Sequence, residues 1–231
     1  MAESCLLYYI TDRRAFPGDD VAQRRRLLEK ISEAARAGVD YIQLRERDLS
    51  TQDLESLTRE AANIIQEAGL ATGNRQLATA LLVNHRTDVA MATEADGVHL
   101  RSDDISPQEV KALWEDCRQG QCGAGTPARQ LSPKPPMIAV SCHSPAEVAQ
   151  AAAVGATFAV FGPVFEKGNT QPAGLTLLRE ACQAKIRVLA LGGVTLSNAR
   201  SCLEAGASGI AGIRLFQDND ISAIVSQLRR V

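Results

Sequence analysis

The chain has 231 residues, 45% of them hydrophobic, which suits one large α/β domain better than a small sandwich. Its 27 acidic and 25 basic residues give a formal net charge of −2, so no overall field attracts nucleic acid or an anionic membrane. No apolar run reaches the roughly 18 residues of a membrane span. The apolar start has no basic segment before it, as a secretory signal would, so we expect a cytoplasmic protein. The six cysteines lack metal-binding spacing and are expected to be reduced and packed.

Short apolar runs alternate with helical patterns along the whole chain. Strand-like runs lie at residues 6–11, 41–44, 80–84, 97–100, 137–142, 158–164, 188–194 and 209–216. Helical patterns lie near residues 21–37, 51–68, 86–94, 106–118, 145–154, 174–184, 196–205 and 219–230. Because the strand-like runs are apolar rather than alternating, they indicate a parallel sheet covered by helices. A doubly wound open sheet would show the same alternation, but eight units in this length favour a single-domain (β/α)8 TIM barrel over residues 1–231.

Four similar junctions support the barrel, at residues 37–41, 94–98, 154–158 and 205–209. Each reads as a helix that ends at a small residue or glycine and is followed at once by a strand. Tight joins at one end and longer loops at the other are typical of such barrels. Residues 119–136 interrupt the alternation of strand-like and helical segments, because they are rich in glycine and proline. We expect a flexible loop there, on the face opposite the functional one.

Charged residues follow the second strand in the run Arg45, Glu46, Arg47 and Asp48. One interpretation is a solvated ladder of ion pairs among the four. The other is a functional site, because side chains at the carboxyl ends of barrel strands point into the site. Several other strand ends of this chain are also polar, so we favour the functional interpretation.

Two glycines, Gly192 and Gly193, end the seventh strand. Such a pair lets the backbone approach a ligand and leaves N–H groups free for a phosphate, although a simple turn would also explain it. Together with residues 209–214 at the eighth strand, it predicts a phosphate site between strands seven and eight.

His143 is the best candidate for an acid or base, because histidine titrates near neutrality and this one follows the fifth strand. The alternative is that it only seals the start of the next helix, near Ser144. We expect His99 to be a packing residue, and the role of His85 is left open.

Taken together, the motifs resemble the thiamine-phosphate synthase and TenI family of (β/α)8 barrels over nearly the whole chain. The matching segments are YYITD (8–12), YIQLRER (41–47), VNHRTDVAMATEADGVHL (83–100), SDDIS (102–106), VSCHS (140–144), FGPVF (161–165), LGGV (191–194) and GIAGIR (209–214). The resemblance implies two activities. The synthase joins a pyrimidine diphosphate to a thiazole phosphate, releases diphosphate and uses Mg2+. TenI-like tautomerases isomerise a thiazole phosphate carboxylate to its aromatic form without a metal.

The resemblance also implies roles for particular residues of this chain. Backbone N–H groups of Gly193, Ile213 and Arg214 would hold the thiazole phosphate. The pyrimidine diphosphate would be bound by a polar set at the ends of strands two, three and five. Its members are Gln43, Arg45, Arg47, Asn84 and, on the pyrimidine side, Ser141.

The chain departs from the synthase pattern at two places. His85 stands where the resemblance implies an aspartate ligand of Mg2+, although Asp104 is present for the second ligand. The loop after FGPVF should carry Thr-x-Thr-Lys, whereas here Lys167 is displaced or the expected lysine is lost. Because a cationic clamp stabilises a departing diphosphate, these changes argue against the synthase.

Our leading hypothesis from the sequence is therefore a thiazole tautomerase with no cofactor. His143 would move the proton, and Arg45 or Lys167 would orient the carboxylate of the substrate. The alternative is a divergent synthase that binds diphosphate through Arg45, Arg47, Asn84 and Lys167, with Mg2+ on Asp104. A second alternative is a non-catalytic regulator that binds thiazole or thiamine phosphate. All three involve small-molecule partners rather than nucleic acid or membrane, and a homo-oligomer is expected from the family alone.

Overall fold

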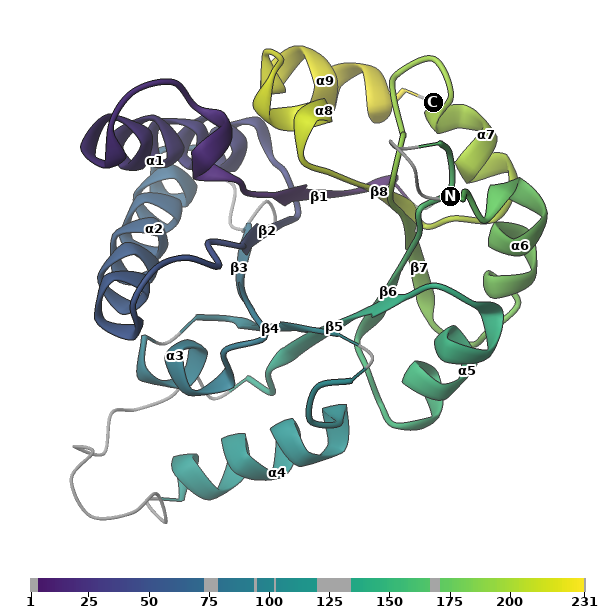
Figure 1. Cartoon of the computed structure of the whole chain (residues 1–231), viewed down its shortest axis with the longest axis horizontal. Helices are drawn as coiled ribbons and strands as arrows, with labels where there is room; N and C mark the ends of the chain where they lie inside the picture. Colours follow the sequence, from purple (N-terminus) through teal and green to yellow (C-terminus); the bar gives the residue numbers. More distant parts are fainter. Residues whose placement is uncertain are drawn as a thin grey trace.

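Eight parallel strands close into a barrel in which each strand pairs with the next and β8 pairs with β1. The computed structural model describes residues 4–72, 79–93, 95–101, 103–119, 134–166 and 171–230. Figure 1 shows the ring of strands with helices around its outside. The predicted (β/α)8 TIM barrel is confirmed. Lys167 and most of the loop predicted at 119–136 lie outside the described residues.

The elements follow the predicted order. The strands are β1 (Leu6–Ile10), β2 (Tyr41–Leu44), β3 (Ala80–Asn84), β4 (Gly97–Leu100), β5 (Met137–Cys142), β6 (Phe158–Phe161), β7 (Arg187–Ala190) and β8 (Gly209–Gly212). The helices are η1 (Arg13–Ala15), α1 (Asp20–Ala37), α2 (Thr51–Thr72), α3 (Thr87–Ala92), α4 (Pro107–Arg118), α5 (Pro145–Ala153), α6 (Gly174–Ala181), α7 (Ala199–Glu204), α8 (Arg214–Gln217) and α9 (Ile221–Leu228). Among the described residues, no helix has the length and apolarity needed to cross a membrane.

The last three strands are shorter than the sequence predicted. β6 ends before Pro163, which has no N–H to offer to a strand ladder. β7 ends before Gly192 and Gly193, whose φ angles of +93° and +65° lie in the left-handed region. After β8 the chain turns at Ile213 into α8, where we had predicted that the strand would continue to residue 216.

The inside of the barrel is closed by aromatic side chains. The rings of Tyr41 and Phe158 stack with their centroids 4.7 Å apart, and Tyr8 meets Phe158 edge-on at 5.5 Å. Tyr41 and Phe158 are the first residues of their strands, so this layer fills the amino-terminal part of the interior. This layer closes the interior below the carboxyl ends of the strands.

The predicted tight junctions are present at the amino-terminal face. Gly38 ends α1 at a φ of +81°, and the carboxylate of Asp40 accepts a hydrogen bond from the Leu7 N–H at 2.7 Å. At the equivalent position before β4, Asp96 accepts from the Leu81 N–H at 2.8 Å. Side chains before the strands thus bond a neighbouring strand at this face, which is where the barrel is secured.

Most of the described cysteines behave as the composition predicted. Cys142 and Cys202 are buried free thiols, and burial raises the pKa of each, to about 12 and about 11. Cys117 is different, because it is bonded in a disulfide, so the expectation of reduced thiols is wrong for it. Among the described residues, no cluster of three or more histidine, cysteine or acidic side chains could hold a metal ion.

Candidate active site

A cavity of about 310 Å³ lies at the carboxyl ends of the strands. Strand ends and the loops that follow them supply its walls, as a barrel site requires. The lining residues are Ile10, Gln43, Arg45, Arg47, Asn84, His99, Arg101, Asp103, Ser141, His143, Leu191 and Ile213. The set is rich in cationic and amide side chains, and it includes seven of the residues singled out from the sequence.

The two carboxylates after β2 pair with Arg13 rather than with Arg45 and Arg47. Arg13 is 4% exposed, and its Nη1 donates to both carboxylate oxygens of Asp48, at 2.7 and 2.9 Å. Glu46 also turns toward Arg13, with its Oε2 3.8 Å from the same Nη1. The interpretation of a local ion-pair ladder is therefore wrong. Within the described part of the chain, no carboxylate lies within ion-pair distance of Arg45 or Arg47.

Arg45 is held at the cavity by its backbone. Its N–H donates to Thr11 Oγ1 at 3.0 Å, and the Thr11 hydroxyl donates in turn to Glu46 Oε1 at 2.6 Å. Burial lowers the pKa of the half-buried Arg45 guanidinium, and the positive charge of Arg47 lowers it further. The two arginines therefore repel each other, and an anion bound between them would relieve this repulsion.

Gln43 and Asn84 form a buried amide pair beside the arginines. Gln43 is 2% exposed, and its Nε2 donates to Asn84 Oδ1 at 2.8 Å. This bond leaves Gln43 Oε1 and Asn84 Nδ2 without a partner among the hydrogen bonds between described residues. The pair therefore offers one acceptor and one donor in fixed positions to a ligand.

His99 lies inside the barrel at the cavity and bonds through both ring nitrogens. Its Nδ1 is 2.9 Å from the Tyr8 hydroxyl and its Nε2 is 2.7 Å from Ser141 Oγ. Burial, with a smaller contribution from the charge of Arg45, lowers the pKa of His99 to about 3, so the ring is neutral. The Tyr8 hydroxyl has no other partner among described residues and donates to Nδ1. The Nε2–H then donates to Ser141, whose own proton is free to point at a ligand.

His143 lies at the exposed rim of the cavity. Its Nδ1 is 2.5 Å from the carbonyl oxygen of Gly162, and a carbonyl can only accept, so Nδ1 carries the proton. The Nε2 atom then has a lone pair with which to accept a proton. The backbone N–H of His143 donates to Glu147 Oε2 at 2.8 Å, which fixes the turn before α5.

The predicted phosphate site is divided between two loops. Ile213 lines the cavity, whereas Gly193 and Arg214 are not among its lining residues. A Cβ on Gly193 would lie 2.8 Å from the Phe165 Cβ, so this glycine lets the loop after β7 pack against the loop after β6. Among the described residues, the N–H groups of Gly193, Ile213 and Arg214 make no backbone or side-chain hydrogen bond. Their role in binding phosphate stays a prediction.

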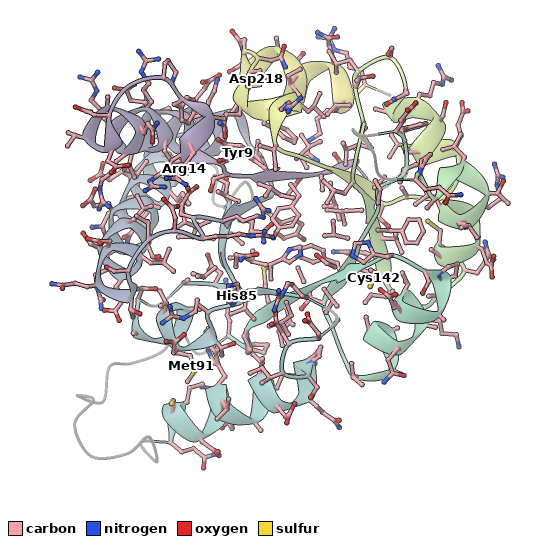
Figure 2. All side chains as sticks on the ribbon, in the orientation of Figure 1. Tyr9, Arg14, His85, Met91, Cys142 and Asp218 are labelled. Carbon is pink, nitrogen blue, oxygen red and sulfur yellow. The ribbon has the colours of Figure 1, made fainter. Side chains whose placement is uncertain are left out.

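The residues at the implied Mg2+ positions do not fit that ion. His85 is exposed, has a φ of +46° and lies beside α3 in Figure 2. Asp104 lines a neighbouring cavity rather than this one, and both of its oxygens face Arg101. Its Oδ2 accepts from the Arg101 N–H at 2.8 Å, and its Oδ1 lies 3.4 Å from Nη2. Mg2+ needs oxygen ligands in near-octahedral geometry. An imidazole and an aspartate already paired with a guanidinium do not supply that.

Sequence reasoning missed three contributors to the site. His99 was expected to be a packing residue, yet it faces the cavity. It was missed because a four-residue apolar strand such as β4 does not show which of its side chains point into the barrel. Arg101 directly follows β4, and the strand-end rule that singled out Arg45 would have found it. Arg13 left no signal, since its partners Glu46 and Asp48 lie 33 and 35 residues away.

Comparisons with known proteins agree on a family. A family model described as thiamine monophosphate synthase matches residues 7–120 and 118–216. A putative thiamine-phosphate synthase 2 of Aquifex aeolicus (strain VF5) is 32% identical over 214 residues, which are 91% of this chain and 96% of that protein. A thiamine-phosphate synthase of Roseiflexus castenholzii (strain DSM 13941 / HLO8) is 34% identical over 213 residues, 90% of this chain and 79% of that protein.

A solved structure gives the same answer. The thiamine phosphate pyrophosphorylase from Pyrococcus furiosus superimposes with a TM-score of 0.74 at 27% identity, covering 99% of this chain and 95% of that one. The family model alone spans most of the chain, and each of the two relatives matches at least 90% of it. The chain therefore belongs to the thiamine monophosphate synthase (TMP-TENI) family.

Proposed function

We propose that the chain is a thiamine-phosphate synthase, which joins a pyrimidine diphosphate to a thiazole phosphate and releases diphosphate. The names of its relatives favour this reaction over the tautomerase that we expected from the sequence. The structural observation that carries the proposal is the pair Arg45 and Arg47, which face the cavity without carboxylate partners among the described residues. Such a pair suits a substrate with several negative charges.

The reaction needs help where charge develops. As the bond between the pyrimidine methylene and the diphosphate breaks, negative charge builds up on the leaving oxygen. Guanidinium groups already in place at that point stabilise the transition state without reorganising. In this proposal Arg45 and Arg47 perform that role, and Arg13 supports them by keeping Glu46 and Asp48 away.

The amide pair and the serine orient the pyrimidine. Gln43 offers an acceptor and Asn84 a donor, while Ser141 offers a hydroxyl proton whose direction His99 sets. The N–H groups of Gly193, Ile213 and Arg214 would hold the thiazole phosphate beside them. Binding both partners in one orientation replaces a collision in solution by a step within the complex. Both substrates are phosphorylated and held inside cells by their charge, consistent with a cytoplasmic enzyme.

A second candidate is the thiazole tautomerase, and His143 is the observation that favours it. Its Nδ1–H is fixed on the Gly162 carbonyl, so its Nε2 is available at the cavity rim as a base. In this reaction His143 would take a proton from one ring position and return it to another. Substituting alanine would then abolish aromatisation, whereas chelator would have no effect.

The synthase is tested by following formation of the joined product from both substrates in wild type and in Arg45→Gln. We expect product in wild type and about a 100-fold lower kcat/KM in the variant, from the loss of one charge-assisted contact to the leaving group. The matched control is Arg200→Gln, an exposed arginine on α7 that pairs with Glu204. Equal loss in both variants, or no product in wild type, would count against the proposal.

A further inference from the structure

Arg101 is the third arginine of the cavity, and the proposed reaction does not yet use it. It directly follows β4 and lines the same cavity as Arg45 and Arg47. Its side chain is 54% exposed, so the guanidinium lies at the mouth rather than in the core. These are the properties of a side chain that can reach an anionic ligand.

The two carboxylates near this position are engaged by Arg101 itself. Its Nε lies 3.3 Å from Asp103 Oδ1, and its Nη2 lies 3.4 Å from Asp104 Oδ1. Asp104 also accepts from the Arg101 N–H and donates its own N–H to the Arg101 carbonyl at 3.3 Å. Arg101 and Asp104 thus form a closed turn, and the guanidinium of Arg101 contacts both carboxylates that could otherwise bind a cation.

The charge of the cavity points the same way. Three arginines line it, against one carboxylate, that of Asp103, whose side chain is 72% exposed. Asp104 lies outside this lining but pairs with Arg101, so the three arginines still outnumber the two aspartates. This excess of positive charge would repel a divalent cation and attract a diphosphate. A planar guanidinium can also donate two parallel hydrogen bonds to phosphate oxygens, which makes it a suitable substitute for a bound cation.

We propose that Arg101 takes the place of the metal ion, so that this cavity binds a diphosphate group through Arg45, Arg47 and Arg101 without magnesium. The proposal rests on the proposed function only for the identity of the anion. It predicts that the affinity for diphosphate does not depend on a divalent cation. It also assigns Asp103 and Asp104 to holding Arg101 in position rather than to metal binding.

The test is calorimetric titration of the whole chain with inorganic diphosphate, once with EDTA and once with excess Mg2+. Wild type is expected to bind with affinities that agree within about twofold. Arg101→Gln is expected to bind about 10- to 100-fold more weakly in EDTA, the usual loss for a charge-assisted contact. Arg101→Lys keeps the charge but lacks the planar guanidinium that donates two parallel hydrogen bonds, so its affinity in EDTA should lie between those of wild type and Arg101→Gln.

Arg200→Gln is again the matched control and should bind like wild type, with urea unfolding used to check that every variant is folded. Binding by wild type that is lost in EDTA would overturn the proposal. So would an Arg101→Gln protein that binds as well as wild type, or a wild type that does not bind diphosphate. Because no turnover is measured, metal-free binding by an enzyme without synthase activity would support this proposal while the proposed function fails.

Discussion

Arg13 and Asp48 are joined by two hydrogen bonds from a single guanidinium nitrogen, at 2.7 and 2.9 Å, although they belong to different strand ends. The contact neutralises the carboxylate of Asp48, which could otherwise pair with Arg47, its neighbour in the sequence. It lowers the pKa of Asp48 through the hydrogen bond from Arg13. The charge of the cavity is therefore set by a residue that does not line it.

Replacing Arg13 should destabilise the fold as well as the site. Arg13→Met leaves Glu46 buried with no cation beside it, and we expect the free energy of unfolding in urea to fall by about 3 kcal/mol. The matched control is Arg14→Met, because Arg14 also contacts Asp48, at 3.3 Å, but its side chain is 69% exposed. Figure 2 shows Arg14 on the α1 and α2 side of the ring. An exposed pair contributes below about 1 kcal/mol, so equal losses in the two variants would contradict this role for Arg13.

The hydroxyl of Ser141 should matter more than its small size suggests. Ser141→Ala removes the proton that His99 directs at the ligand, and kcat/KM should fall about 10- to 100-fold. Tyr8→Phe keeps Ser141 but removes the hydroxyl that fixes which ring nitrogen of His99 carries the proton. A roughly 5- to 10-fold lower kcat/KM is expected, because a hydrogen bond between neutral groups is weak. Steady-state kinetics measure both, with Tyr41→Phe as a control that changes a barrel tyrosine not bonded to His99. A Tyr8→Phe enzyme as active as Tyr41→Phe would show that the relay does not orient Ser141.

His99 should make the free energy of unfolding depend on pH. Burial lowers its pKa from 6.5 to about 3 in the folded protein. Between these two values the unfolded chain binds a proton that the folded protein does not, so the free energy of unfolding falls as the pH falls from 6.5 toward 3. The contribution of this group is at most about 1.4 kcal/mol per pH unit.

Urea unfolding of wild type and His99→Gln across this pH range measures that contribution. The variant should show a shallower decline, while the matched control His85→Gln, which removes an exposed imidazole, should keep the wild-type slope. A His99→Gln protein with an unchanged slope would mean that His99 is protonated in the fold.

Gly193 should not tolerate a side chain. A Cβ there would meet the Phe165 Cβ at 2.8 Å and the Glu166 carbonyl oxygen at 2.9 Å, in a backbone with a φ of +65°. Gly193→Ala should therefore displace the loop, cost about 1–3 kcal/mol and raise KM for the thiazole phosphate. Gly174→Ala is the matched control, because its φ is +76° but, apart from its chain neighbours, no atom of the described residues lies within 4 Å of the new Cβ. If both variants raise KM equally, loop packing at Gly193 is not what positions the phosphate.

The fold was predictable because its signals are local. Apolar runs and tight junctions such as those before β2 and β4 repeat along the chain, and each can be recognised without knowing its neighbours. Strand ends were less predictable at β8, where a continuous apolar run hides the turn at Ile213 into α8. Hydrophobicity alone does not distinguish a strand from the short buried helix that follows it.

The site was predictable only where a residue lies at the carboxyl end of its strand or directly after it. Arg45, Asn84 and Ser141 were identified in this way, and the structure brings them into one cavity. The hydrogen-bond partners that give them their chemistry were not identified, because they come from distant segments. Tyr8 lies 91 residues from His99, and no local pattern records that contact.

The reaction that we expected from the sequence is not the one that the names of the relatives favour. Two departures from a synthase pattern, at His85 and near Lys167, led us to expect a tautomerase. The first departure carries less weight if Arg101, which lines the cavity from the loop after β4, replaces the metal ion as proposed. Lys167 lies outside the described residues, so the second stays open to experiment.

The most direct test of the central claim is release of diphosphate by the wild-type chain given both synthase substrates, measured with and without chelator. We expect release that requires both substrates and continues in chelator, with the joined product formed in equal amount. No release, together with aromatisation of the non-aromatic thiazole phosphate that is lost in His143→Ala, would contradict the claim and establish the tautomerase instead.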